Sequence, residues 1–109
     1  MTRLEVIEMI GDVITDVDIA RGSLMPDAPE RHQLDDLRLL LDDRQRKLSQ
    51  LVFDENTKAF TDAAARLKSV NDQIQGTINK VDDMVTLLTN VQRFLDAATS
   101  LMKVAAAVR

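Results

Sequence analysis

The 109-residue sequence contains no cysteine, tryptophan or tyrosine, and it has only three glycines and two prolines. Without cysteine there is no disulfide framework and no thiolate chemistry. The scarcity of glycine and proline leaves most of the chain free of strong helix breakers. Aromatic residues make up only 3% of the chain, so that aliphatic side chains supply almost all the apolar volume. Such side chains suit helix interfaces, and the composition predicts an all-α protein.

The chain also lacks long hydrophobic runs and an excess of positive charge. No apolar stretch approaches the roughly 18 residues of a transmembrane helix. Glu5 and Glu8 interrupt the segment where the apolar core of a signal peptide would lie. The net charge is −4 at pH 7, and the densest basic stretch, residues 44–47, directly follows two aspartates. Because nucleic-acid affinity depends on clustered lysine and arginine, we expect no nucleic-acid partner. Because the sequence shows neither a signal peptide nor a transmembrane helix, we expect a cytoplasmic protein.

Residues that can carry chemistry are present, but they are not grouped as an active site would need. Three aspartate pairs, at 35–36, 42–43 and 82–83, each follow an apolar residue of the helical pattern and are expected to face solvent. Glu5 and Glu8 form an E-x-x-E that resembles half of the magnesium-binding pattern of all-α nucleotide pyrophosphohydrolases, but no E-x-x-D follows it. We predict no catalytic residue, no cofactor and no metal, in a protein that is not an enzyme.

Turn residues mark the end of a first helix, predicted over residues 2–21. Its apolar residues are spaced alternately four and three apart, at Val6, Ile10, Val13, Val17 and Ala20. Gly22 is a candidate left-handed cap, and both prolines fall in a linker over 22–29.

A second helix is predicted over 28–53, because Asp27 and Glu30 have the spacing of a capping box. Its apolar positions are Leu34, Leu37, Leu41, Leu48 and Leu51. Arg44 stands where a further leucine is expected. Its side chain either reaches from the seam into water or is a buried charge that sets the helix register. The pattern breaks after Leu51, where we expect a tight turn, with a stutter in a continuous rod as the alternative.

A sustained heptad repeat is the strongest pattern in the second half. Large apolar residues recur every seven positions, at Phe60, Leu67, Ile74, Val81, Leu88, Leu95 and Met102. The pattern predicts one helix over 55–107, on the order of 75 Å long, with Gly76 at an outward position. The predicted fold is therefore an elongated all-α bundle or coiled coil, forming a single helical domain of two shorter helices and one long C-terminal helix. The alternative is a turn at 75–77, which would fold the chain into a compact four-helix monomer.

The apolar face of the predicted long helix widens towards its C-terminal end. A second helix that folds back along its first half would leave that end uncovered. We therefore expect a non-enzymatic assembly protein that binds a second copy of itself or another helical protein. The predicted interface residues are Val81, Val85, Leu88, Val91, Phe94, Leu95, Leu101 and Met102. A membrane-active helical protein is the alternative, since a broad apolar helix face can also bind lipid.

Overall fold

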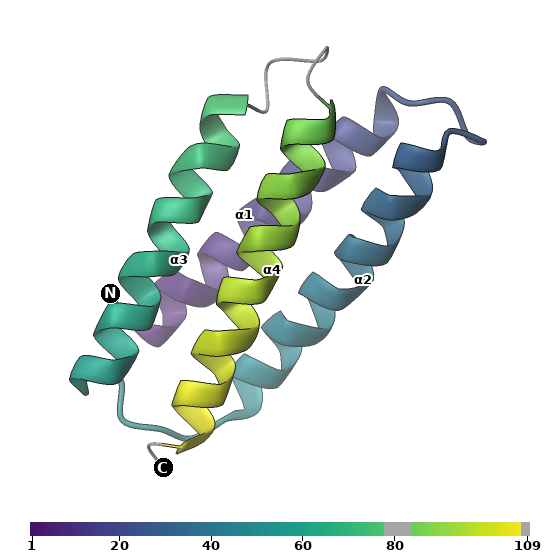
Figure 1. Ribbon diagram of the computed structural model, residues 1–109. Helices are drawn as coiled ribbons and strands as arrows, with labels where there is room; N and C mark the ends of the chain where they lie inside the picture. Colours follow the sequence, from purple (N-terminus) through teal and green to yellow (C-terminus); the bar gives the residue numbers. More distant parts are fainter. Residues whose placement is uncertain (78–83, 108–109) are drawn as a thin grey trace.

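The computed structural model describes residues 1–77 and 84–107. It contains four α-helices, α1 (Arg3–Gly22), α2 (Pro29–Gln50), α3 (Lys58–Thr77) and α4 (Met84–Ala107), and no strand among these residues. The helices run alternately up and down the long axis of a molecule that measures 43 × 23 × 17 Å (Figure 1). The all-α prediction is confirmed.

The prediction of one long C-terminal helix is wrong. The segment 55–107 contains two helices, α3 and α4, which lie side by side in opposite directions (Figure 1). The turn that the alternative prediction put at 75–77 is not found there either, because α3 continues through Gly76 to Thr77. Val81, one of the heptad residues, lies outside the described residues.

The reason for this error is a difference between the two helices in the width of the buried stripe. In α3 the heptad residues Phe60, Leu67 and Ile74 are fully buried. In α4 the positions immediately before the heptad residues are buried as well, at Leu87, Phe94 and Leu101; of the heptad residues themselves, Leu95 is buried, whereas Leu88 and Met102 are only partly buried. The buried stripe of α4 is therefore wider than that of α3 and extends to one side of the heptad positions. An unbroken repeat in the sequence therefore conceals a hairpin, in which the wider buried stripe of α4 is covered by two helices of the same chain, α2 and α3.

The first helix begins with a complete capping box. The Thr2 side chain accepts a hydrogen bond from the Glu5 backbone N–H, and the Glu5 carboxylate accepts one from the Thr2 N–H. These contacts lower the pKa of Glu5, because they stabilise its charged form. The predicted caps further along are wrong. Gly22 has no positive φ, and α2 starts from Ala28 without a side-chain cap, one residue later than Asp27 would require.

The chain forms two helical hairpins, α1–α2 and α3–α4, which pack together mainly through α2 and α4. α2 and α4 run in the same direction, so that residues 51–57, which join the hairpins, cross one end of the bundle (Figure 1). Arg3 of α1 binds this connection in two places. Its side chain donates to the Leu51 carbonyl (2.7 Å), and its backbone N–H donates to the Glu55 carboxylate (2.7 Å). The helix break predicted after Leu51 is found, but as the connection 51–57 and not as a tight turn, and the continuous rod is excluded.

A single apolar core runs between the four helices. The seam predicted for the first helix is buried throughout, and so are the α2 leucines from Leu34 to Leu48 that the pattern selected. Phe60 of α3 and Phe94 of α4 are the largest fully buried side chains. α4 therefore contributes to the core of its own chain, and only its side chains outside that core are available to contact another protein.

Candidate interaction groove

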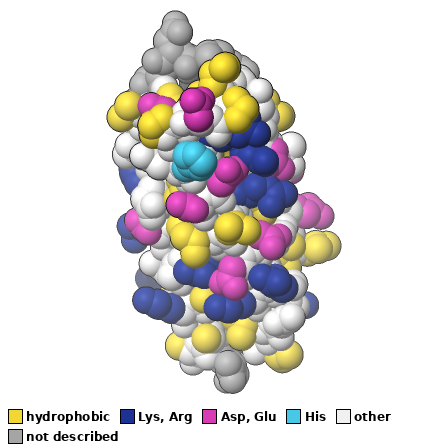
Figure 2. Space-filling model, turned by 90° about the vertical axis from the view of Figure 1, so that its right-hand side faces the viewer, with side chains coloured by type: hydrophobic (Ala, Val, Ile, Leu, Met, Phe, Trp, Pro, Cys, Tyr) yellow, Lys and Arg dark blue, Asp and Glu magenta, His cyan; other side chains and the backbone are white. Residues whose placement is uncertain are grey.

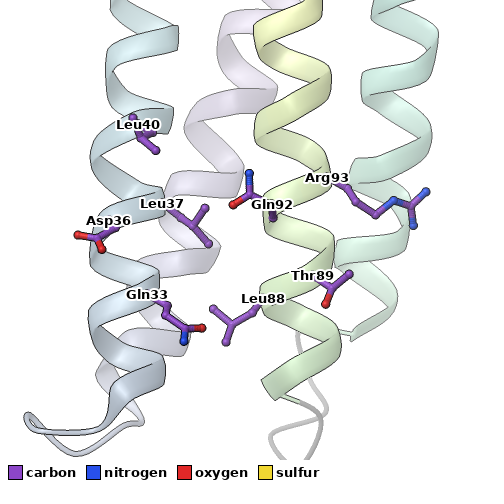
Figure 3. A pocket seen from close by; sticks show the side chains of 8 residues that line it. All are labelled: Gln33, Asp36, Leu37, Leu40, Leu88, Thr89, Gln92 and Arg93. Carbon is purple, nitrogen blue, oxygen red and sulfur yellow. The ribbon is translucent and has the colours of Figure 1, made fainter.

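The candidate site is a groove of about 510 Å³ between the N-terminal halves of α2 and α4. Each helix contributes residues three or four positions apart, which therefore share one face of that helix. We call this site the α2–α4 groove, and it is lined by Gln33, Asp36, Leu37, Leu40, Leu88, Thr89, Gln92 and Arg93 (Figure 3).

The interior of the α2–α4 groove is apolar and its edges are polar. Leu37 and Leu88 point from the two helices into the space between them (Figure 3). Leu37 is buried, Leu88 is partly buried, and Leu40 is 42% exposed. Gln33 and Gln92 supply amide groups at the edges. An apolar surface with a few hydrogen-bonding groups around it is typical of a site for another polypeptide.

Arg44 separates the α2–α4 groove from the lower part of the same helix pair. Its guanidinium Nε donates to the Thr99 hydroxyl on α4 (3.0 Å), and Thr99 in turn donates to the Leu95 carbonyl (2.9 Å). The Arg44 side chain is only 20% exposed and forms an ion pair with Asp43. It does not simply extend into water, as the first of the two interpretations required. The contact between α2 and α4 is thus polar at Arg44 and Thr99, and it is open as a groove nearer the N-terminal ends of the two helices.

Charged side chains of both signs occur along the whole of α2. Asp36, at the edge of the α2–α4 groove, is exposed and has no hydrogen bond or ion pair to any residue that the structure describes. Further along, Asp43 alone faces three cations, Arg44, Arg46 (3.8 Å) and Lys47 (3.2 Å). The hydrogen bond from Lys47, together with the positive charges of Lys47 and Arg44, lowers the pKa of Asp43. Around Asp43, basic groups therefore outnumber acidic ones.

The structure separates the eight predicted interface residues into three groups. Val91, Phe94, Leu95 and Leu101 are buried inside the single chain. Val85 is exposed one turn before the α2–α4 groove, Leu88 lies within it, and Met102 is partly buried further down α4. Val81 lies outside the described residues. A second chain is not needed to cover the whole C-terminal face, because α2 and α3 already cover most of it.

The α2 side of this groove was not predicted from the sequence. Leu40 does not belong to the apolar seam of α2, and neither does its neighbour Leu39, which is 66% exposed. Two adjacent leucines outside the buried stripe of an amphipathic helix were the signal that could have found this surface.

A second hollow, of about 300 Å³, lies between α1 and α3 and is polar. It is lined by Asp12, Thr15, Asp16, Asn71 and Gln75. The Gln75 amide already donates to Asp16 (2.7 Å). Across the described residues, no three histidine, cysteine or acidic side chains are placed to hold a metal ion together. In this hollow a hydrogen bond between Gln75 and Asp16 joins the two helices.

Comparison with known proteins does not assign the chain to a family. It matches no protein-family model, and the searches of curated proteins and of solved structures find no significant match. Within residues 1–77 and 84–107, no helix combines the length and hydrophobicity needed to cross a membrane.

Proposed function

We propose that this protein is a non-enzymatic interaction module that binds a helix of another polypeptide in the α2–α4 groove. The observation that carries the proposal is the apolar interior of the groove, formed by Leu37, Leu40 and Leu88 between two helices that run in the same direction. Covering such an apolar surface with a partner lowers the free energy, which favours binding.

A helix is the partner that best suits this groove. An amphipathic helix presents apolar residues at positions i, i+3 or i+4, and i+7, and so can place a row of side chains along a groove between two helices. Gln33, Thr89 and Gln92 offer hydrogen bonds at the edges, where the partner's polar side chains would lie. Exposed Val85 extends the apolar surface beyond one end.

This proposal keeps the helical partner predicted from the sequence and moves the contact surface. Of the predicted interface residues, Leu88 contributes directly and Val85 lies beside the groove. The proposed partner is an amphipathic helix, either from a second copy of this chain or from another protein.

Binding can be tested with a library of amphipathic helical peptides, from which binders to the wild-type protein are selected. We expect Leu88→Glu to weaken the selected peptides by at least about tenfold, because a charge would then lie in the apolar interior. Val52→Glu, at an exposed valine of the loop far from α4's N-terminal half, is the matched control and should leave affinity unchanged. Circular dichroism checks that both variants fold. Failure to recover binders, or equal loss in both variants, would refute the proposal.

A further inference from the structure

We infer that the helix bound in the α2–α4 groove carries basic residues along one flank of its apolar stripe and acidic residues along the other, and that these charges fix its direction. This inference rests on the proposed function and names the chemistry of the partner. A helix that presents its apolar stripe to the groove also presents the positions on either side of that stripe to α2 and to α4. The charges on the two edges of the groove therefore select among amphipathic helices.

The two edges of the groove carry opposite charges. Of the described residues that line it, only Asp36 on α2 and Arg93 on α4 are charged. Both side chains are exposed, and they point away from the space between the helices to opposite sides, whereas Leu37 and Leu88 point into it (Figure 3). A helix lying over these leucines would thus have an acidic group on one side and a basic group on the other.

The two charges also lie at nearly the same height along the groove. α2 and α4 run in the same direction (Figure 1), and Arg44 donates a hydrogen bond to Thr99 (3.0 Å), so that positions 55 residues apart lie level. By this register Asp36 is level with Val91, two residues before Arg93, which is on the order of 3 Å along the axis. A single turn of a bound helix can therefore face both charges at once.

Neither charge is paired with an opposite charge within the described residues. Asp36 has no ion pair there, whereas its neighbour Asp35 pairs with Arg21 (2.6 Å). Arg93 donates to the side-chain oxygen of Gln73 on α3 (2.8 Å), and a neutral amide does not compensate the charge of a guanidinium. Both groups can therefore attract an oppositely charged side chain of a partner, and both would repel a like charge.

A partner of one charge sign gains little on this side of the molecule. Acidic and basic side chains lie next to one another over the face formed by α2, with hydrophobic side chains between them (Figure 2). A uniformly basic helix would attract Asp36 and repel Arg93, and a uniformly acidic helix would do the reverse. A helix with one basic and one acidic flank satisfies both edges, and it does so in one direction only, because reversing the helix exchanges its flanks.

The charges can be tested with designed helical peptides that share one leucine stripe. One peptide has lysines on one flank and glutamates on the other, and a second has glutamines on both. We expect the charged peptide to bind the wild-type protein roughly three- to tenfold more tightly at low salt, because it forms two exposed ion pairs. Asp36→Asn and Arg93→Gln should each reduce this advantage by roughly two- to fivefold and leave binding of the neutral peptide unchanged.

Two exposed charges on α3 supply matched controls. Asp62→Asn and Arg66→Gln make the same changes in net charge at positions away from the groove, and they should alter the affinity for neither peptide. Equal effects of the groove and control substitutions, or equal binding of the charged and neutral peptides, would overturn the inference.

A paramagnetic label on the N-terminus of the charged peptide tests its direction. Val85 lies beyond one end of the groove and Thr99 beyond the other. We expect the label to broaden the backbone NMR signal of one of these residues, and the same label on a peptide with exchanged flanks to broaden the other. In the variant Asp36→Lys/Arg93→Glu each peptide should reverse its direction. Broadening at the same end with both peptides would contradict the inference.

The inference and the proposed function fail in different ways. Peptides that bind, lose affinity in Leu88→Glu and are indifferent to the charges on their flanks would overturn the inference and leave the helix-binding function. A protein that binds no helical peptide, charged or neutral, would refute the proposed function and this inference with it.

Discussion

The two hairpins of this bundle share one shape but are held together differently. Between α1 and α2, Asp18 and Arg38 form an ion pair (2.6 Å), and so do Arg21 and Asp35 (2.6 Å). Both hairpins bury large apolar side chains, but between α3 and α4 the described residues form no ion pair. Ala97 and Ala98 are buried on α4, and small side chains of this kind allow close helix approach.

This difference indicates that ion pairs determine the register of α1 and α2, whereas buried apolar side chains determine the stability of the bundle. The two α1–α2 ion pairs belong to one antiparallel register, since moving along α1 from residue 18 to 21 moves the partner on α2 from 38 back to 35. These side chains remain about two-fifths exposed, and exposed pairs contribute little free energy. The buried apolar core should therefore contribute most of the stability, while the ion pairs select how α1 and α2 align.

The largest effect is expected from truncating the apolar contact of α4. Phe94→Ala should lower the free energy of unfolding by about 3–5 kcal/mol, because it leaves a cavity at a fully buried position. Urea denaturation followed by circular dichroism measures the change. Val85→Ala, at an exposed position of the same helix, is the control and should change it by less than about 0.5 kcal/mol. A loss in Phe94→Ala no greater than in the control would show that α4 does not anchor the core.

A smaller effect of opposite sign is expected at Asn90, the one polar residue that interrupts the buried face of α4 in the described residues. This residue is only 7% exposed. Asn90→Ala should raise the free energy of unfolding by about 1 kcal/mol, because it removes a buried polar group and improves helix propensity. Asn71→Ala on α3, where Gln75 provides a hydrogen bond, should not be stabilising to the same extent. A loss of stability in Asn90→Ala would contradict this account.

The smallest effect is expected for the ion pairs of the α1–α2 hairpin. The hydrogen bond and charge of Asp18 raise the pKa of Arg38, so the arginine remains charged throughout the accessible pH range. Asp18→Asn and Arg38→Met should each lower the melting temperature by no more than a few degrees. A double-mutant cycle in thermal unfolding should show coupling at low salt that fades in about 1 M NaCl. Coupling that persists at high salt would mean that the pair is screened from solvent more than its exposure indicates.

The individual helices were largely predictable, because each one carries a clear apolar stripe. Val6, Ile10 and Val13 fall on one face at helical spacing, and they are buried as that spacing requires. The breaks near the prolines and after Leu51 were also predictable, since the pattern stops there. The α3–α4 division was not. Leu87, Phe94 and Leu101 precede the heptad residues by one position, and their apolar character was interpreted as a wider face for a second chain. In the structure these three side chains are buried in the core of their own chain, where α2 and α3 pack on α4.

The α2–α4 groove also could not be predicted from the sequence. Leu40 and Leu88 are more than forty residues apart, and only the parallel packing of α2 and α4 brings them together. No local pattern reports that juxtaposition. Arg44 is similar, because the sequence placed it on the seam but could not say that the Thr99 hydroxyl would receive its hydrogen bond.

By itself, the sequence determined that this protein is helical and which face of α1 and α2 is buried, because helix propensity and apolar spacing act over a few neighbouring residues. Only the tertiary structure decided that the second half folds into a hairpin, that α2 and α4 run in the same direction, and that an apolar groove remains between them. These features depend on contacts between residues far apart in the chain, where a repeat of seven is compatible with partners from the same chain or from another.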